Sequence, residues 1–270
     1  MKTLKLARES GAKAEVCDYG AHVIRWANSA GREWLFLSSK ALFQPGKAIR
    51  GGVPVIFPQF NEFGSGKRHG FARLSQWEHC DGGDNGDHQV MLRLTSNSST
   101  RQIWPCEFTA HYQVALQGDE LSMTLTVENT DAQPIEFTAA LHTYLKVNNF
   151  PDIKITGFQG KEFWDNGAGP FTERLLFKDY ELAFDDAIDR VYFNVDHPLT
   201  LTDGVDQLGI NMSGFRDVVV WNPGAEGAEA LGDMDDQEYR QMVCVEAAVI
   251  DQPVRLGPGE KWQGSQVLQG

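Results

Sequence analysis

Apolar and polar residues alternate along residues 108–127, and this period of two constrains the fold more than any other feature of the chain. Every second residue is apolar from Phe108 to Leu116, and again from Leu121 to Val127. A glycine-containing segment, residues 117–120, separates the two runs. Alternation of this kind is typical of half-buried strands, so the pattern predicts an antiparallel hairpin.

Further strands are expected along almost the whole chain. The same reasoning predicts strands at Ile135–Leu141, Val23–Trp26, Trp34–Leu37, Val90–Thr95, Ile153–Thr156, Val191–Val195, Leu199–Thr202, Val218–Trp221, Gln241–Ile250 and Gln266–Leu268. Only Glu173–Tyr180 has a helical pattern, and we expect a short helix there. No linker or repeat divides the chain, so residues 1–270 are predicted to form one all-β domain. Two large sheets packed face to face, or a barrel, are the natural architectures.

The polar run at residues 81–87 has some features of a calcium-binding loop. Leu92 stands at the twelfth position of that frame, where a bidentate glutamate is required. We therefore expect a hairpin turn there.

Composition limits the classes of partner. The formal net charge is −13, which argues against a nucleic-acid surface because phosphate backbones are held by clustered lysine and arginine. No apolar run is long enough for a membrane span, and residues 1–16 lack the apolar core of a secretory signal. The four cysteines (Cys17, Cys80, Cys106 and Cys244) have no CxxC spacing. They are interpreted as reduced thiols of a cytoplasmic protein, without a disulfide framework or a zinc site.

Two arginines and a histidine lie on glycine- and proline-rich segments of this acidic chain. Arg50 precedes Gly51-Gly52, and His69 and Arg73 flank Gly70-Phe71-Ala72. Paired glycines permit positive φ angles or close approach of a ligand to the backbone. The segments therefore fit a small anion site, although a tight structural turn with two surface arginines is an equal alternative.

Glu246 interrupts a strand that is apolar on both faces. In residues 241–250, Val243, Val245 and Val249 lie on one face, and Glu246 shares the other with Met242, Cys244 and Ala248. Burial of a carboxylate costs several kcal/mol unless the group is paired or functional. A raised pKa would suit Glu246 to act as a general base, whereas the structural alternative is a buried Glu–Arg pair.

Three other residues have an ordinary reading as well as a functional one. His142 falls on the polar face of its predicted strand, where a histidine is usually solvated or hydrogen-bonded. Asp189 resembles an ordinary charged entry to a strand. Trp221 could stack on a ligand, but core packing is the commoner role of a single tryptophan.

Five ordered motifs together resemble a known family. Ile49-Arg50-Gly51-Gly52-Val53-Pro54, His69-Gly70-Phe71-Ala72-Arg73, Leu141-His142-Thr143-Tyr144, Val220-Trp221-Asn222-Pro223 and Cys244-Val245-Glu246 occur in the order seen in glucose-6-phosphate 1-epimerases. These hexose-6-phosphate mutarotases belong to the aldose 1-epimerase, or galactose mutarotase-like, superfamily. The likeness runs from about residue 15 to residue 262. It implies a β-supersandwich of large antiparallel sheets, in agreement with the period of two.

The resemblance also implies roles for individual residues. By matching position, His142 would protonate the ring oxygen O5, and Glu246 would take the proton from the anomeric hydroxyl. Arg50 and Arg73 would hold the 6-phosphate, with His69 in the same wall, and Asp189 would bind a sugar hydroxyl. The segment Asn61–Arg68 departs from the family pattern, which leaves the part played by Lys67 or Arg68 open.

The function implied is interconversion of the α and β anomers of a hexose 6-phosphate, with glucose 6-phosphate as the default substrate. Proton transfer alone opens the ring, so no metal or redox cofactor is expected. We expect a monomer with a small-molecule substrate. Two alternatives are an epimerase of free aldoses such as galactose and a non-catalytic protein that senses a sugar phosphate.

Overall fold

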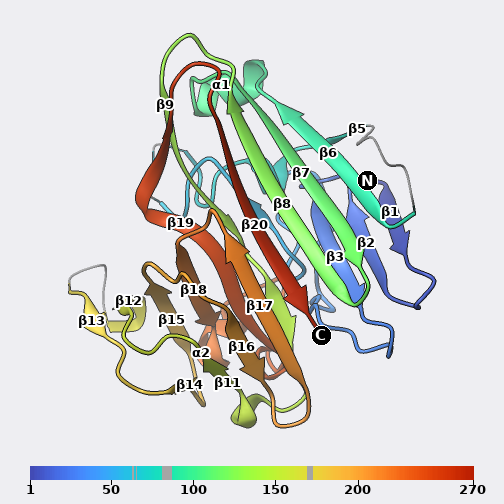
Figure 1. Cartoon of the computed structure of the whole chain (residues 1–270), viewed down its shortest axis with the longest axis vertical. Helices are drawn as coiled ribbons and strands as arrows, with labels where there is room; N and C mark the ends of the chain where they lie inside the picture. Colours follow the sequence, from blue (N-terminus) through green and yellow to red (C-terminus); the bar gives the residue numbers. More distant parts are fainter. Residues whose placement is uncertain (63, 65, 81–86, 169–172) are drawn as a thin grey trace.

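Two large antiparallel sheets and a third, small one contain nearly all of the regular structure (Figure 1). The computed structural model describes residues 1–62, 64, 66–80, 87–168 and 173–270. Every pairing between the strands of these sheets is antiparallel in the described part of the chain. The all-β class predicted from the alternation is thus confirmed.

The first large sheet has nine strands and contains the predicted hairpin. Its spatial order is β14 (Glu181–Ala183), β11 (Lys154–Thr156), β16 (Leu199–Thr202), β17 (Gln207–Ser213), β20 (Lys261–Gln269), β8 (Glu120–Asn129), β7 (Phe108–Gln117), β6 (Gln89–Thr95) and β5 (Glu78–Cys80). β7 and β8 pair along their whole length, from Phe108 opposite Asn129 to Gln117 opposite Glu120. Buried and less buried side chains alternate along all of β8 and along β7 as far as Val114, as the sequence pattern predicts, and Ala115 of β7 is buried as well.

The second large sheet has eight strands and supports the candidate site. Its main path is β13 (Leu175–Leu176), β12 (Glu162–Asp165), β15 (Ile188–Tyr192), β18 (Asp217–Asn222), β19 (Met242–Leu256), β9 (Ile135–Leu141) and β4 (Val55–Ile56), with β10 (Tyr144–Lys146) also paired to β19. β19, the longest strand, joins three neighbours. All of its residues from Met242 to Ile250 are buried, so both faces of this part of the sheet are covered.

The remaining elements are short. The small sheet contains β1 (Thr3–Ala7), β2 (Lys13–Cys17) and β3 (His22–Ala27). The two α-helices are α1 (Ser98–Ile103) and α2 (Gly224–Glu229), and the 3-10 turns are η1 (Ala72–Leu74), η2 (Phe150–Asp152), η3 (Asn166–Ala168) and η4 (Glu238–Gln241). Neither α-helix exceeds six residues, and no helix among the described residues could cross a membrane.

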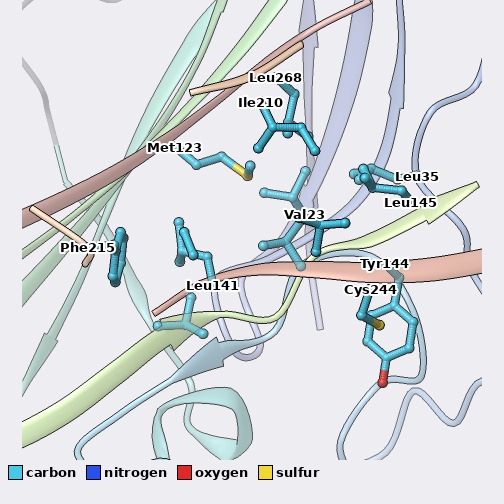
Figure 2. Close-up of a cluster of buried hydrophobic side chains, with 14 of the residues drawn as sticks. Val23, Leu35, Met123, Leu141, Tyr144, Leu145, Ile210, Phe215, Cys244 and Leu268 are labelled. Atoms are coloured by element: carbon cyan, nitrogen blue, oxygen red, sulfur yellow. The ribbon is translucent and has the colours of Figure 1, made fainter. Parts of the chain in front are cut away.

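The main core combines side chains of both large sheets with those of the small one. Figure 2 shows part of this core, where Met123 and Leu268 of the nine-stranded sheet lie near Leu141 of the eight-stranded sheet and Val23 of the small sheet. A separate cluster that includes Val191, Val219, Ala248 and Ile250 covers the opposite face of the eight-stranded sheet. This second face is the one from which Glu246 projects, because side chains two residues apart on a strand share a face.

Several local expectations were wrong or incomplete. Glu173–Tyr180 forms no helix: only Phe177 is buried there, so a helix would have no apolar face, and Leu175–Leu176 instead pair with β12 as β13. Trp34–Leu37 makes isolated bridges and not a strand. The strand expected at Val191–Val195 lies at Ile188–Tyr192. Most of the expected hairpin turn at residues 81–87 lies outside the described residues.

The two short helices were missed because neither has a repeating apolar face. The start of α1 is nevertheless marked in the sequence: the side chain of Asn97 accepts hydrogen bonds from the backbone N–H groups of Ser99 and Thr100. Thr100 returns the contact by accepting from the backbone of Asn97, which completes a capping box.

Gly51 and Gly52 adopt the positive φ angles expected of them, +105° and +61°. A Cβ on Gly52 would lie 2.2 Å from the carbonyl oxygen of Val23 and 2.7 Å from Nε2 of His22. The backbone therefore needs glycine here for its conformation and for its close packing against β3. This turn fixes the position of the neighbouring Arg50.

We expect Gly52→Ala to destabilise the protein by more than about 3 kcal/mol, because it adds a steric clash to the strain of a positive φ. Gly46→Ala is the matched control: φ is +80° there, but no atom lies within 4 Å of the added Cβ. Conformational strain alone should cost this control about 1–2 kcal/mol. Urea denaturation measures both changes, and equal losses would contradict the close packing inferred for Gly52.

Candidate active site

The register of β19 places a histidine opposite Glu246. Tyr144 of β10 pairs with Cys244, and Leu141 of β9 pairs with Ala247, which is the same antiparallel register on both sides of the short break between β9 and β10. His142 falls in that break, directly opposite Glu246. Its Nε2 atom lies 3.4 Å from Oε1 of Glu246. Residues 104 positions apart in the sequence thus become cross-strand neighbours.

Both members of this pair are deeply buried. His142 is 8% exposed and Glu246 is 1% exposed. Burial raises the pKa of Glu246 well above its usual range, an effect that Asp189 strengthens and that Arg73 and Arg68 oppose. Burial also lowers the pKa of His142 well below its usual range, assisted by His69, Arg73 and Arg50. The solvated state that is usual for such a histidine is therefore not found here.

Each member of the pair also keeps one polar atom without a protein partner. Nδ1 of His142 and Oε2 of Glu246 are buried and make no hydrogen bond within the described part of the chain. Among the described residues, no arginine forms an ion pair with Glu246, so the alternative of a buried Glu–Arg pair is wrong. Buried polar atoms without partners are costly, and they are common where a ligand supplies the missing contact.

The ring of His142 is held in place by aromatic neighbours. It stacks on Tyr144, with ring centroids 4.8 Å apart and planes 7° apart. Trp221 of β18 packs edge-on against both rings, at 6.1 Å from each. Trp221 is therefore both a partly buried packing residue and part of the wall of the cavity that contains the pair.

Arg50 lines the same cavity and is firmly tethered. Its Nε atom donates to Oδ1 of Asp233 at 3.1 Å, and a terminal nitrogen donates to the Tyr144 hydroxyl at 3.0 Å. Burial alone would lower its pKa, but Tyr144 and Asp233 outweigh burial and raise it. Arg50 is thus a permanent cation of fixed orientation. The reading of Arg50 as a surface side chain on a structural turn is wrong.

Arg73 and Arg68 add two more cations to the cavity wall. One terminal nitrogen of Arg73 donates to the backbone oxygen of Arg68 at 3.0 Å, while Nε of Arg73 is buried without a partner. Burial, reinforced by Arg50 and Arg68, lowers the pKa of Arg73 to about 10, so the side chain remains charged at neutral pH. Three guanidinium groups facing one small cavity form a strong local attraction for an anion.

Arg50, Arg68 and Arg73 together form a cationic wall of the cavity. His69 lies in the same wall and is a neutral hydrogen-bonding group. Its Nδ1 atom accepts from the backbone N–H of Asn61 at 3.2 Å, which leaves the proton of the neutral ring on Nε2. Burial next to Arg73 and Arg68 lowers its pKa to about 2. Its ring centroid is 5.8 Å from that of His142. His69 is therefore a close neighbour of the acid–base pair and lines the same cavity as the arginines.

Asp189 of β15 provides a polar group on another side of the cavity. Its carboxylate accepts a hydrogen bond of 2.9 Å from the side chain of Asn166, and the amide oxygen of Asn166 is buried without a partner among the described residues. Burial raises the pKa of Asp189, and the hydrogen bond from Asn166 opposes that rise. A carboxylate and an amide together can bind neighbouring hydroxyl groups.

All six predicted site residues line this one cavity: Arg50, His69, Arg73, His142, Asp189 and Glu246. Sequence reasoning missed Asn166 and Asp233, because no motif marks them. It assigned no role to Tyr144, although Tyr144 is part of the motif Leu141-His142-Thr143-Tyr144. It left open the choice between Lys67 and Arg68. Both residues are exposed, but Arg68 lines the cavity and Lys67 is not among the lining residues.

Comparison with known proteins identifies the family of the chain. The family model described as aldose 1-epimerase matches residues 2–269. A protein of Cenchrus ciliaris that carries the name "Putative glucose-6-phosphate 1-epimerase" is 36% identical over 94% of this chain and 80% of its own length. The crystal structure of a "putative mutarotase" from Salmonella typhimurium superposes with a TM-score of 0.86 at 29% identity, covering 96% of this chain and 86% of that one.

A more distant structure extends the likeness in fold. The galactose mutarotase-like protein from Lactobacillus casei superposes with a TM-score of 0.81 at 18% identity, over 99% of both chains. The fold is therefore the galactose mutarotase-like one that the resemblance implied. Because the family model covers nearly the whole sequence, this chain belongs to the aldose 1-epimerase family.

Proposed function

We propose that this protein interconverts the α and β anomers of hexose 6-phosphates, with glucose 6-phosphate as the principal substrate. The observation that carries the proposal is the buried His142–Glu246 pair, 3.4 Å apart, in a cavity that Arg50, Arg68 and Arg73 also line. The pair accounts for acid–base chemistry at a sugar ring. A neutral sugar has no use for three cations, whereas a phosphate group does.

Glu246 takes the proton from the anomeric hydroxyl while His142 delivers a proton to the ring oxygen, which breaks the C1–O5 bond and opens the ring. Rotation about C1–C2 and reversal of both transfers close the ring as the other anomer. The two residues share one proton. His142 holds it in the ionised form of the pair, and Glu246 holds it in the neutral form. Because the ionised and neutral forms of the pair hold the same number of protons, the active form arises by transfer within the pair.

The cationic wall positions the substrate for this reaction. Arg50 and Arg73 bind the 6-phosphate by charge-assisted hydrogen bonds, Arg68 adds charge, and Nε2 of His69 donates nearby. Asp189 and Asn166 bind sugar hydroxyls. Binding at the phosphate thus holds C1 and O5 near the acid–base pair, and the chemistry itself moves only protons. One chain supplies every residue of the site, so we propose an active monomer, located in the cytoplasm as the cysteine pattern predicts.

Exchange spectroscopy by NMR tests the proposal directly. We expect the protein to accelerate the interconversion of the glucose 6-phosphate anomers much more than that of glucose or galactose. Glu246→Gln and His142→Ala should each lower the turnover number by about 10²–10⁴-fold, because each removes one proton-transfer group. Acceleration of galactose instead would favour an epimerase of free sugars. Binding of glucose 6-phosphate without acceleration would favour a sensor.

Arg73→Ala should raise KM for glucose 6-phosphate by about 10–100-fold, the value of a hydrogen bond to a charged group, and should change turnover of glucose little. Arg216→Ala is the control, because Arg216 is exposed, bonds to Gln252 and is not among the residues that line this cavity. Anomer exchange rates over a range of substrate concentrations measure both variants. An equal loss on the phosphorylated and the free sugar would refute the role of Arg73 as a phosphate ligand.

A further inference from the structure

A thiol lies beside the acid–base pair and has no part in the proposed proton transfers. Cys244 precedes Glu246 by two residues on β19, so both side chains project from the same face of the strand. One donor atom each of His142, Cys244 and Glu246 lies within 4.8 Å of the others. All three side chains are buried. Figure 2 shows Cys244 next to the ring of Tyr144, on which His142 stacks.

The cluster has unused capacity to bind a ligand. Nδ1 of His142 and Oε2 of Glu246 are both buried and unpartnered. Imidazole, thiolate and carboxylate are the three side-chain groups that bind zinc in proteins. We propose that His142, Cys244 and Glu246 form a site for one thiophilic divalent cation, of the Zn²⁺ or Cd²⁺ type, and that the bound cation inhibits the enzyme by occupying its acid–base pair.

The chemistry of the donors selects the class of cation. A thiolate sulfur and an imidazole nitrogen suit Zn²⁺ and Cd²⁺, whereas Mg²⁺ and Ca²⁺ require oxygen ligands. Binding displaces the thiol proton of Cys244 and any proton on Glu246, so the two anionic ligands balance the charge of the ion. Arg50 forms an ion pair with Asp233, which weakens its repulsion of a bound cation. Arg73 has no such partner among the described residues and opposes binding, which fits an inhibitory site better than a permanently loaded one.

Only a small rearrangement is needed to bind the cation. A tetrahedral zinc ion holds its ligand atoms about 3.5 Å apart, so side-chain rotations that move the three ligand atoms by about 1 Å complete a three-ligand site. The fourth position then faces the cavity, which His142 and Glu246 line. A cation bound there takes the electron pairs that His142 and Glu246 need to exchange protons with a sugar. The binding claim stands on the cluster alone, and the inhibition claim rests on the proposed function.

The test uses the whole protein, freed of metal by chelation, with Zn²⁺, Co²⁺ and Mg²⁺ as probes. Calorimetry should show one Zn²⁺ per chain, and bound Co²⁺ should give the near-ultraviolet absorption of a thiolate ligand. Cys244→Ser should weaken Zn²⁺ binding by at least about 100-fold, since even residues outside the coordination sphere contribute about 10–100-fold. Cys17→Ser is the matched control, because Cys17 is an equally buried free thiol on β2.

The same variants should separate inhibition from catalysis. Zn²⁺ should abolish anomer exchange by the wild type and by Cys17→Ser. Anomer exchange by Cys244→Ser should resist inhibition by Zn²⁺, and Mg²⁺ should inhibit none of the three proteins. Bound Co²⁺ without a thiolate band in the wild type would overturn the proposal, even if Cys244→Ser failed to fold. Undiminished Zn²⁺ binding by a folded Cys244→Ser would overturn it as well. If the wild type showed no turnover, the proposed function would fail while calorimetry and Co²⁺ absorption still decided the site.

Discussion

Glu246 places a carboxyl group in the middle of a strand that is covered on both faces, and the site is organised around that burial. β19 can bury it because the strand pairs with β18, β9 and β10, so its backbone groups are bonded on both sides. The side chain then contacts His142, a neighbour that can share a proton with it, across the sheet. Without that partner the buried carboxyl group would be uncompensated. Its burial gives it the raised pKa that suits the proposed general base.

The two partly buried arginines of the cationic wall differ in how firmly they are held: Arg50 is fixed, whereas Arg73 is free to bind a ligand. Asp233 fixes Arg50, and the segment that carries Asp233 is itself fixed. The single proton of the Ser38 hydroxyl is shared between the backbone oxygen of Asp233 at 2.9 Å and the carboxylate of Glu238 at 2.7 Å, and that carboxylate also accepts from the backbone N–H of Ser39. Nε of Arg73, in contrast, is unpartnered and can turn fully to a ligand. Preorganised charge of this kind binds a phosphate with little reorganisation.

The sequence predicted the elements better than their contacts. Alternation at Phe108–Leu116 and Leu121–Val127 depends only on which face is buried, and the predicted strands are found as β7 and β8. The helix predicted at Glu173–Tyr180 was wrong, because a helical pattern of apolar residues indicates a helix only where those residues are buried. Of the site, Glu246 could be recognised locally, as a charge in an apolar strand. Its pairing with His142 depends on sheet register, and the tether of Arg50 to Asp233 spans 183 residues, so neither is encoded in local spacing.

The most direct test of this account is the pH dependence of stability in Glu246→Gln, which keeps the shape of the side chain but cannot ionise. In the unfolded chain Glu246 ionises above about pH 4.3, whereas in the folded protein it holds its proton up to its raised pKa. The wild type should therefore lose stability relative to Glu246→Gln as pH rises through that window, by up to about 1.4 kcal/mol per pH unit.

Urea denaturation between about pH 5 and about pH 8 measures the difference, with Glu229→Gln at an exposed carboxyl as the control. We predict a gap that widens with pH for Glu246→Gln and stays constant for the control. A gap for Glu246→Gln that is constant, or that narrows as pH rises, would contradict the claim that burial holds the proton on this carboxyl group.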